Sequence, residues 1–586
     1  MGARFVHAMP FGATVRPDGT AQFRIWAPSV VGMSVQIESG LSLPMREEAG
    51  GWHVAEIACP VGTRYKYRLP DGTLVPDPAS RRQHGDVHGW SVVFDPAAHE
   101  WHFDDWLGRP WHEAVIYELH VGLLGGFAGV AARLEALRDL GITAIELMPI
   151  ADFPGTRNWG YDGVLPFAPD EAYGTPGELK TLIDRAHGLG LMVLLDVVYN
   201  HFGPDGNYVH AYAEAFFDPD TQTPWGAAIA FGRREVRDFF VHNALYWLNE
   251  YRLDGLRFDA AHAIAPQSAL PELAAAIRAG VDPARHVHLV LEHEGNRASL
   301  LGNDGFDAQW ADDAHHCLHV LLTGEREGYY RDYPDPAAQL ARALRDGFAY
   351  QGEVSPRGKR RGEPSGGLPP SRFVFCLQNH DQIGNRAFGE RLTMLADADA
   401  LLAAQALLLL APQVPLLFMG EEFGSSAPFL YFTDHAPDLA RRVREGRLRE
   451  FAHFAAFADE RRREQIPDPN APATFALCVP EPADTDPRTH EQTRLLLSLR
   501  TRHLAPRLPG CRSLAADAVG DAGVLARWVM GDGAELVVAC NLGARPVPMD
   551  AVDGPMLFES HPGDADRVRT GRLPARCTVA FLLGTA

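Results

Sequence analysis

Acidic side chains close three of the most apolar stretches of this 586-residue chain. The runs GLRFD, LVLE and FVFCLQNHD end in Asp259, Glu292 and Asp381. One such residue after a strand is usually a helix N-cap or a solvated loop residue and needs no functional explanation. Three in one chain are harder to explain in that way, and they predict a site where carboxylates converge.

A cluster of carboxylates in a partly dry site has a defined chemistry. The charges repel one another, so the pKa of at least one group rises and a proton donor is present near neutral pH. Glycosidic bond cleavage needs such a pair, because one group attacks or stabilises the anomeric carbon while the other protonates the leaving oxygen. Arg257 lies two residues before Asp259 on the same strand face, where its charge favours ionisation of that carboxyl group.

Eight apolar segments separated by helical patterns are expected to position these groups. Strands that are apolar throughout, each followed by a helix, indicate a parallel sheet buried on both faces. Eight such units predict a (β/α)8 barrel, an α/β fold whose reactive groups collect where strands end. The segments are residues 114–122, 142–150, 191–201, 253–262, 286–294, 306–313, 373–381 and 414–422.

Short alternating segments flank the expected barrel on both sides. TAQFRIWAP and RYKYRLP, with Asp-Gly turns between such segments, predict an N-terminal β-sandwich over residues 1–100. The hairpin-like GVLARWVMGDGAELVVACNLG predicts a small C-terminal β domain over residues 506–586. The barrel with its inserted loops and helices then occupies residues 101–505. The Pro/Gly/Arg-rich residues 352–370 are expected as a long surface loop on its active side.

The charge balance disfavours some partners. The chain has 54 Lys and Arg against 75 Asp and Glu, a net charge of −21, which argues against binding to nucleic acid or to an anionic membrane surface. Its 46% hydrophobic residues suffice for sizeable cores. The most apolar run, ALLAAQALLLLAP at 400–412, is too short to span a bilayer and predicts a buried helix.

The N-terminus and the cysteines favour the cytoplasm. MGARFVHAMP lacks the charged and apolar regions of a secretory signal, and Val6 stands where a myristoylation motif has Ser or Thr. The seven scattered cysteines contain no CxxC pair, and their odd number favours free thiols in a reducing compartment. We therefore expect a cytoplasmic protein.

Four segments resemble the signature segments of the α-amylase family of glycoside hydrolases. They are DVVYNH, GLRFDAAH, the strand ending in Glu292, and QNHD at 378–381. Longer stretches resemble the trehalose-releasing members of that family, among them IELMPIADFPGTRNWGYDG, DAQWADDAHHCLHVLLTGEREGYY and QNHDQIGNR. The similarity extends over most of the chain, including both flanking β domains.

The resemblance implies a role for each matched position. Asp259 would be the nucleophile that forms a covalent glycosyl intermediate, and Glu292 would be the general acid and then the base. Asp381 would hold the sugar hydroxyls in the distorted shape of the transition state. Asp196 would orient Arg257, which belongs to the substrate-binding set.

The other substrate contacts are implied by the same resemblance. Tyr161 would stack on the glucose ring at the cleaved bond. His201 and His380 would donate hydrogen bonds to its hydroxyl groups, and His262 at the end of the fourth strand would complete the substrate-binding set.

Two places depart from the family pattern. The segment EHEGN carries a second acid, Glu294, and strand alternation puts Glu292 and Glu294 on one side, so alternation leaves the choice of general acid open. Glu292 directly ends the apolar run and is the preferred candidate. The loop HVGLLGGFAG at 120–129 is shorter than the usual form, which predicts a change at one edge of the cleft.

The His-rich segment WADDAHHCLH at 310–319 could be interpreted as a metal site, since its Asp and His side chains are suitable ligands. The resemblance explains the same residues through packing and through the substrate cleft. Some relatives hold calcium near the position of Asn200, but the trehalose-releasing members do not depend on it. We expect no metal and no cofactor.

The resemblance implies hydrolysis, with retention, of the α-1,4 bond next to the terminal trehalose of a maltooligosyltrehalose, a step of trehalose biosynthesis. The partner would be this α-glucan oligosaccharide, and the protein a monomer or small homo-oligomer. The main alternative is a glycogen branching enzyme or another α-glucan hydrolase of the family, against which QNHDQIGNR and DAQWADDAHH count. A catalytically silent glycan-binding protein is a third interpretation. The presence of all three acids disfavours it.

Overall fold

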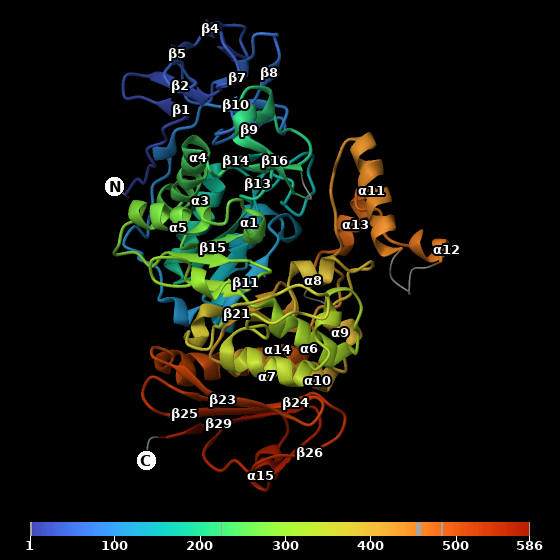
Figure 1. The fold of residues 1–586 in the computed structure, drawn as a ribbon. Coiled ribbons are helices and arrows are strands. Elements are labelled where there is room, and N and C mark those ends of the chain that lie inside the picture. Colours follow the sequence, from blue (N-terminus) through green and yellow to red (C-terminus); the bar gives the residue numbers. More distant parts are fainter. Residues whose placement is uncertain (1–2, 224–225, 453–458, 482–484, 585–586) are drawn as a thin grey trace.

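The computed structural model describes residues 3–223, 226–452, 459–481 and 485–584. The N-terminal strands lie at one end of the molecule, the barrel in the middle and a C-terminal sheet at the opposite end (Figure 1). In these described ranges, no helix combines the length and the apolar character needed to cross a membrane.

Short strands form two antiparallel sheets before the barrel. Their orders are β1-β2-β6-β5 and β4-β3-β7-β10-β9, with β8 paired to β7. Phe23 of β2 and Tyr65 of β7 meet between the sheets, with 4.7 Å between ring centroids, so the expected N-terminal sandwich is present. The strands are β1 Gly12–Val15, β2 Thr20–Trp26, β3 Ser34–Ile37, β4 Ser42–Pro44, β5 Arg46–Glu48, β6 Trp52–Ala58, β7 Arg64–Arg68, β8 Leu74–Val75, β9 Gln83–His84 and β10 Trp90–Val92.

Parallel strands close into a barrel whose order follows the sequence. Each barrel strand falls within one of the eight predicted segments, which confirms the (β/α)8 fold. The strands are buried along their whole length, as expected for a sheet covered on both faces. They are β11 Ile116–Leu119, β12 Ala144–Leu147, β15 Met192–Val197, β18 Gly255–Phe258, β19 His288–Leu291, β20 Ala308–Trp310, β21 Phe373–Cys376 and β22 Val414–Phe418.

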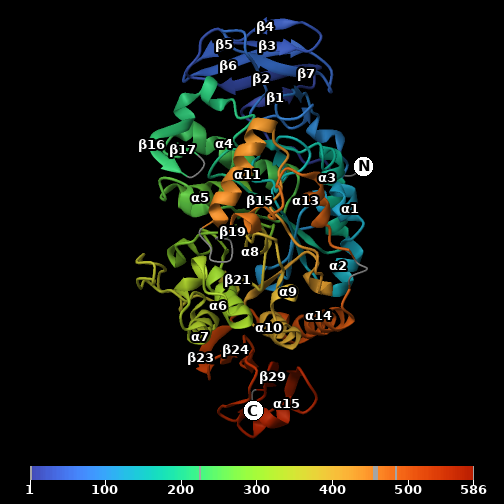
Figure 2. The same ribbon diagram turned by 90° about the vertical axis from the view of Figure 1, so that its right-hand side faces the viewer.

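Helices surround the barrel (Figures 1 and 2). The start of α3 is fixed by a capping box, in which Thr175 and Glu178 each accept a hydrogen bond from the other's backbone N–H. Helix α10 confirms the buried helix predicted near residues 400–412. These helices are α1 Gly126–Ala131, α2 Leu134–Leu140, α3 Pro176–Gly188, α4 Arg234–Leu245, α5 Ala269–Gly280, α6 Asp312–Thr323, α7 Pro336–Asp346, α10 Ala398–Leu410 and α14 Pro487–Leu499.

Insertions extend the carboxyl side of the barrel, where α8 directly follows β21. Figure 2 shows α11 in front of the barrel on this side, and Figure 1 shows it standing off beyond α8. Arg447 of α11 donates from Nη2 to the carbonyl oxygen of Gly384 at 2.6 Å, which ties α11 to the end of α8. The inserted elements are β13 Ala151–Asp152, β14 Leu165–Pro169, β16 Phe217–Thr223, β17 Gly226–Ile229, α8 His380–Gly384, α9 Leu392–Leu395, α11 Pro437–Phe451, α12 Glu460–Arg463 and α13 Pro472–Leu477.

The chain ends in a five-stranded antiparallel sheet of order β23-β24-β25-β29-β27. The predicted hairpin forms its centre, with Gly523 opposite Asn541 and Val529 opposite Glu535. The sheet is attached to the barrel where Thr578 Oγ1 donates to the carbonyl oxygen of Ala403 in α10 at 2.7 Å. The strands of this sheet are β23 Arg512–Val519, β24 Gly523–Val529, β25 Glu535–Asn541, β27 Met556–Glu559 and β29 Cys577–Leu583. Helix α15 Asp564–Arg569 and a separate pair of strands, β26 Val547–Pro548 and β28 Arg572–Leu573, complete this region.

Candidate active site

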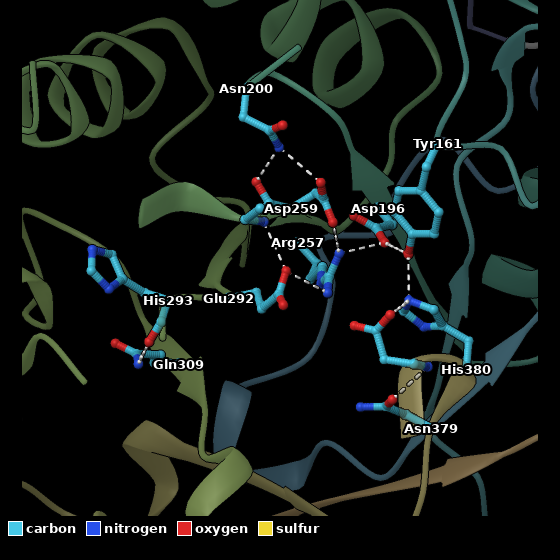
Figure 3. A network of polar contacts seen from close by, with 12 residues as sticks. Tyr161, Asp196, Asn200, Arg257, Asp259, Glu292, His293, Gln309, Asn379 and His380 are labelled. Carbon is cyan, nitrogen blue, oxygen red and sulfur yellow. Dashed lines mark hydrogen bonds and ion pairs between the residues drawn. The ribbon is translucent and has the colours of Figure 1, made fainter. Parts of the chain in front are cut away.

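A buried arginine stands at the centre of a polar cluster at the carboxyl ends of the barrel strands (Figure 3). Arg257 of β18 is 0% exposed and lies opposite Asp196 of β15. Its Nη1 is 2.7 Å from Asp196 Oδ2 and 2.9 Å from Asp259 Oδ1, and its Nη2 is 2.9 Å from Glu292 Oε2. One guanidinium therefore holds carboxylates that follow or belong to three neighbouring strands.

Burial and ion pairing act in opposite directions on Arg257. Burial opposes its charge, but Asp196 and Glu292 outweigh burial and raise the pKa of Arg257 well above its usual value. The ring of Trp310 covers the guanidinium at 4.3 Å from its centroid, a favourable cation–π arrangement. The cluster therefore contains a permanent cation. Burial still raises the pKa of Asp196 to about 7, although attraction to Arg257 acts against this rise.

The chain turns sharply directly after Asp259. Ala260 has φ 38° and ψ 46°, in the left-handed region that costs a non-glycine residue about 1–2 kcal/mol. In this conformation its N–H donates to Glu292 Oε2 at 2.7 Å. Asn200 Nδ2 donates to Asp259 Oδ2 at 2.8 Å. Asp259 and Glu292 are thus each fixed by Arg257 and by one further donor.

His380 joins the cluster from the other side. Its Nε2 is 2.8 Å from the hydroxyl oxygen of Tyr161, which donates to Asp196 Oδ2 at 2.6 Å. Its Nδ1 is 2.5 Å from Oε1 of Glu118, a residue of β11. The rings of Tyr161 and His380 are stacked at 5.2 Å (Figure 3). A continuous chain of polar contacts therefore runs from Glu118 through His380, Tyr161 and Asp196 to Arg257.

Asp381 lies beside this chain at an open cleft of about 280 Å³. Its side chain is 37% exposed, and Oδ1 is 3.5 Å from His380 Nε2. Asp312 lines the same cleft, and burial, followed by repulsion from Glu292, raises its pKa to about 7. Arg357 and Arg361 of the predicted surface loop 352–370 also line the cleft.

The two remaining predicted histidines lie at different distances from the centre of the cluster. His201 Nε2 is 2.9 Å from the carbonyl oxygen of Tyr161, and its Nδ1 contacts the side chain of Asn200, so it belongs to the cluster. His262 lies in the short turn Ala261–Ala263, where its ring centroid is 5.9 Å from that of His293. It borders the cluster on the side of Glu292.

The structure corrects the expectation about Glu292 and Glu294. Strand β19 ends at Leu291, so strand alternation does not continue through both acids. Glu292 contacts Arg257 and the N–H of Ala260, whereas Glu294 is exposed at the rim of the cleft. The local backbone therefore separates two acids that the sequence pattern leaves equivalent.

The His-rich segment forms the start of α6, and its side chains have separate partners. Asp313 accepts hydrogen bonds from Asn296 Nδ2 and from the N–H of Ala349, both at 2.8 Å. His319 Nε2 is 2.8 Å from Glu325 Oε2, while burial lowers the pKa of His315 to about 3. Among the described residues, no group of three or more His, Cys, Asp or Glu side chains is placed to hold a metal ion. The expectation of no metal remains a prediction.

Two acids inside barrel strands were missed by the sequence reasoning. Glu118 of β11 and Glu146 of β12 lie directly opposite each other, and both are 1% exposed. Both oxygens of Glu146 lack a hydrogen-bond partner among the described residues. Burial, followed by repulsion from Glu118 and Asp196, raises the pKa of Glu146 well above its usual value. The signal was present, because an acid inside an otherwise apolar strand needs a partner or a proton.

Comparison with known proteins identifies the family. The alpha amylase catalytic domain matches residues 81–242, and a domain of unknown function (DUF3459) matches residues 511–581. The malto-oligosyltrehalose trehalohydrolase of Deinococcus radiodurans is 39% identical over 546 residues, which are 91% of this chain and 89% of that protein. This chain belongs to the malto-oligosyltrehalose trehalohydrolase family. It is thus a glycoside hydrolase of the α-amylase type.

Two further relatives extend the comparison. The trehalohydrolase of Saccharolobus solfataricus is 41% identical over 460 residues, covering 75% of this chain and 80% of that protein. A crystal structure from Salmonella typhimurium, of a protein assigned to the alpha amylases, is 42% identical with a TM-score of 0.92. It covers 98% of this chain and all of that chain. The structural likeness therefore extends over nearly the whole chain, including both flanking β regions.

Proposed function

We propose that this chain hydrolyses the α-1,4-glucosidic bond next to the terminal trehalose of a maltooligosyltrehalose, with retention of configuration. The observation that carries the proposal is that Asp259 and Glu292 contact neighbouring nitrogens of one guanidinium. Retaining glycosidases need two carboxyl groups about 5–5.5 Å apart, closer than inverting enzymes do. Family membership supports the choice of bond and of leaving group.

In the first step, Asp259 attacks the anomeric carbon on the non-reducing side of the bond while Glu292 gives its proton to the glycosidic oxygen. Trehalose leaves, and the remaining glucan is bound covalently to Asp259. In the second step, Glu292 as carboxylate takes a proton from water, and the water oxygen displaces Asp259. Two inversions return the original α configuration.

The surrounding residues are proposed to serve these steps. Arg257, oriented by Asp196, pairs with Asp259 and holds its carboxylate in place for the attack. Asp381 is open to the cleft and binds sugar hydroxyls in the transition state. Tyr161 packs against the sugar ring, with His201 and His380 as hydroxyl contacts.

The part of the site that binds the departing trehalose is proposed to border His262. This residue lies on the side of Glu292, the proposed general acid, rather than on the side of Tyr161. The domain boundaries at residues 100/101 and 505/506 and a cytoplasmic monomer or small homo-oligomer complete the proposal. All seven cysteines are free, which supports a reducing compartment.

Product analysis tests the function. Purified protein is incubated with maltotriosyltrehalose and, separately, with maltopentaose, and the products are separated by chromatography. We expect free trehalose from the first substrate and slow or no attack on the second. Equal hydrolysis of both would contradict the trehalose specificity, and longer branched products would favour the branching enzyme.

A further inference from the structure

Glu118 belongs to barrel strand β11, and both of its carboxylate oxygens contact one residue, His380. Oε1 is 2.5 Å from His380 Nδ1, and Oε2 accepts from the backbone N–H of His380 at 3.2 Å. Hydrogen bonding of β11 to both β12 and β22 fixes the backbone that carries Glu118. The contact therefore sets the position of the His380 ring and of the chain that enters α8.

The hydrogen bonds around Tyr161 decide how many protons the His380 ring carries. Asp196 Oδ2 accepts one hydrogen bond from Arg257 Nη1 at 2.7 Å and a second from the hydroxyl group of Tyr161 at 2.6 Å, which uses the single hydroxyl proton of Tyr161. The Tyr161 oxygen must then accept a proton from His380 Nε2 at 2.8 Å. Since Nδ1 faces the Glu118 carboxylate, both ring nitrogens act as donors, and the ring is an imidazolium.

We propose that Glu118 is a positioning residue of the reaction, which keeps His380 as an imidazolium with Nε2 directed at Tyr161 and Asp381. Burial raises the pKa of Asp381, and a cation at this place, with Nε2 3.5 Å from Asp381 Oδ1, opposes that rise. The effect on turnover rests on the proposed function, whereas the protonation state of the ring is a property of the free protein.

Charged and titratable groups from several elements surround the ring. They are Glu118 of β11, His120 after it, Glu146 of β12, Tyr161, Asp196 of β15, Arg257 of β18 and Asp381 of α8. Burial works against the imidazolium, but attraction to Glu118 and Asp381 outweighs it and raises the pKa of His380 to about 10. Arg257 acts in the opposite direction.

Glu118→Gln removes the charge and keeps the size of the side chain. The pKa of His380 then falls, so the imidazolium is lost as pH rises through the lowered value, whereas the wild-type ring stays charged up to pH about 10. We expect the ratio of kcat/KM in the variant to that of the wild type to fall about tenfold between pH 5.5 and pH 8.5. A ratio that is constant with pH would overturn the proposal.

Two further variants separate charge from packing. Glu113→Gln removes a carboxylate from the short turn before β11, where Glu113 pairs with Arg109 at 2.8 Å. The ratio of kcat/KM in this variant to that of the wild type should be independent of pH. Glu118→Asp keeps the charge but shortens the side chain. We expect its kcat/KM to be lower than that of the wild type, and the ratio of the two values to be independent of pH. If Glu118→Gln does not fold, a ratio for Glu118→Asp that drops toward high pH would contradict the proposal.

A spectroscopic measurement on the wild type needs no substrate. Protein with 15N-labelled histidine is studied by NMR at pH 8.5, and the His380 signals are assigned by their loss in His380→Gln. We expect both ring nitrogens to be protonated, and a neutral ring would overturn the proposal. If the wild type is charged at His380 yet releases no trehalose, the proposed function fails and the assignment of the ring remains.

Discussion

Glu292 and Glu294 are two residues apart and have different surroundings. Glu292 receives the N–H of Ala260 at 2.7 Å and lies 2.9 Å from Arg257, whereas Glu294 is exposed beside the cleft. A general acid must reach the leaving oxygen, and a positioned acid typically contributes about 10²–10⁴-fold to the rate. The position of Glu292 next to Asp259 fits this role better than the rim position of Glu294.

We expect Glu292→Gln to lower kcat for trehalose release about 10³-fold, and Glu294→Gln to change it less than about threefold. Trehalose is quantified in single-turnover and steady-state assays. α-Glucosyl fluoride, whose leaving group needs no proton, should restore much of the first step in Glu292→Gln. An inactive Glu294→Gln beside an active Glu292→Gln would reverse the assignment.

Acids that follow a strand were easier to predict from the sequence than Glu118 and Glu146, which lie inside strands. Asp259 and Asp381 could be found because an acid closes an apolar run at each place. Glu118 and Glu146 were missed although each is an acid inside an otherwise apolar strand, and barrel closure shows that both are buried opposite each other. Which acid faces Arg257 depends on the φ of Ala260 and on the end of β19, neither of which follows from residue types.

At the scale of elements, Asp313 at the start of α6 organises one wall of the cleft. It is 0% exposed, pairs with Arg361 Nη2 at 3.0 Å, and accepts from the N–H groups of Ala349 and Tyr350 at 2.8 and 3.2 Å. Arg361 Nε also donates to the carbonyl oxygen of Glu294 at 3.1 Å. One buried carboxylate thus joins the loop 352–370 to α6 and to the segment after β19.

Asp313→Asn should loosen this wall, because Arg361 is left without its buried counter-charge, a change that typically costs about 3–5 kcal/mol. We expect a lower free energy of unfolding in urea and several-fold faster trypsin cleavage at the exposed Arg357, Lys359 and Arg360. Asp304→Asn, a change at an exposed acid in the loop before β20, serves as the control. Equal cleavage rates in the two variants would contradict the role of Asp313.

The elements themselves were the most predictable level. Short apolar strands alternating with amphipathic helices favour a parallel sheet, and all eight barrel strands, three to six residues long, lie within the expected segments. The wall built on Asp313 was not foreseen. WADDAHHCLH contains many suitable metal ligands, and the sequence does not indicate that the Asp313 carboxylate binds loop backbone instead.

At the scale of the molecule, the N-terminal segment joins the barrel through a buried polar junction. The N–H of His7 donates to Glu250 Oε2 at 3.2 Å, and Lys180 Nζ is 3.4 Å from Glu250 Oε1. His7 Nε2 lies 2.9 Å from His242 Nδ1. Burial, followed by repulsion from His242 and Arg81, lowers the pKa of His7 to about 4.

This junction should weaken in acid. The folded-state pKa of His7 lies below its unfolded value of about 6.5, so the unfolded chain binds more protons between these values, and the stabilisation present above pH 6.5 is lost as pH falls toward 4. We expect the Tm to drop over this window and to drop less in His7→Gln. His210→Gln, at an exposed site, should follow the wild type. An identical drop in His7→Gln and wild type would contradict this account.

The segment from Gln378 to Arg386 is anchored from three distant parts of the chain. Glu118 holds His380, Glu325 binds Arg386 at 2.7 and 3.0 Å, and Arg447 donates to the carbonyl oxygens of Gly384 and Arg386. These anchoring residues are synthesised in sequence order, and the last of them, Arg447, is 61 residues beyond Arg386. A nascent chain thus carries Asp259 and Glu292 long before Asp381 has its final support. We therefore expect catalytic competence to come late in synthesis, since a chain truncated before Arg447 would contain the proposed acids but would lack the hydrogen bonds that Arg447 donates to the end of α8.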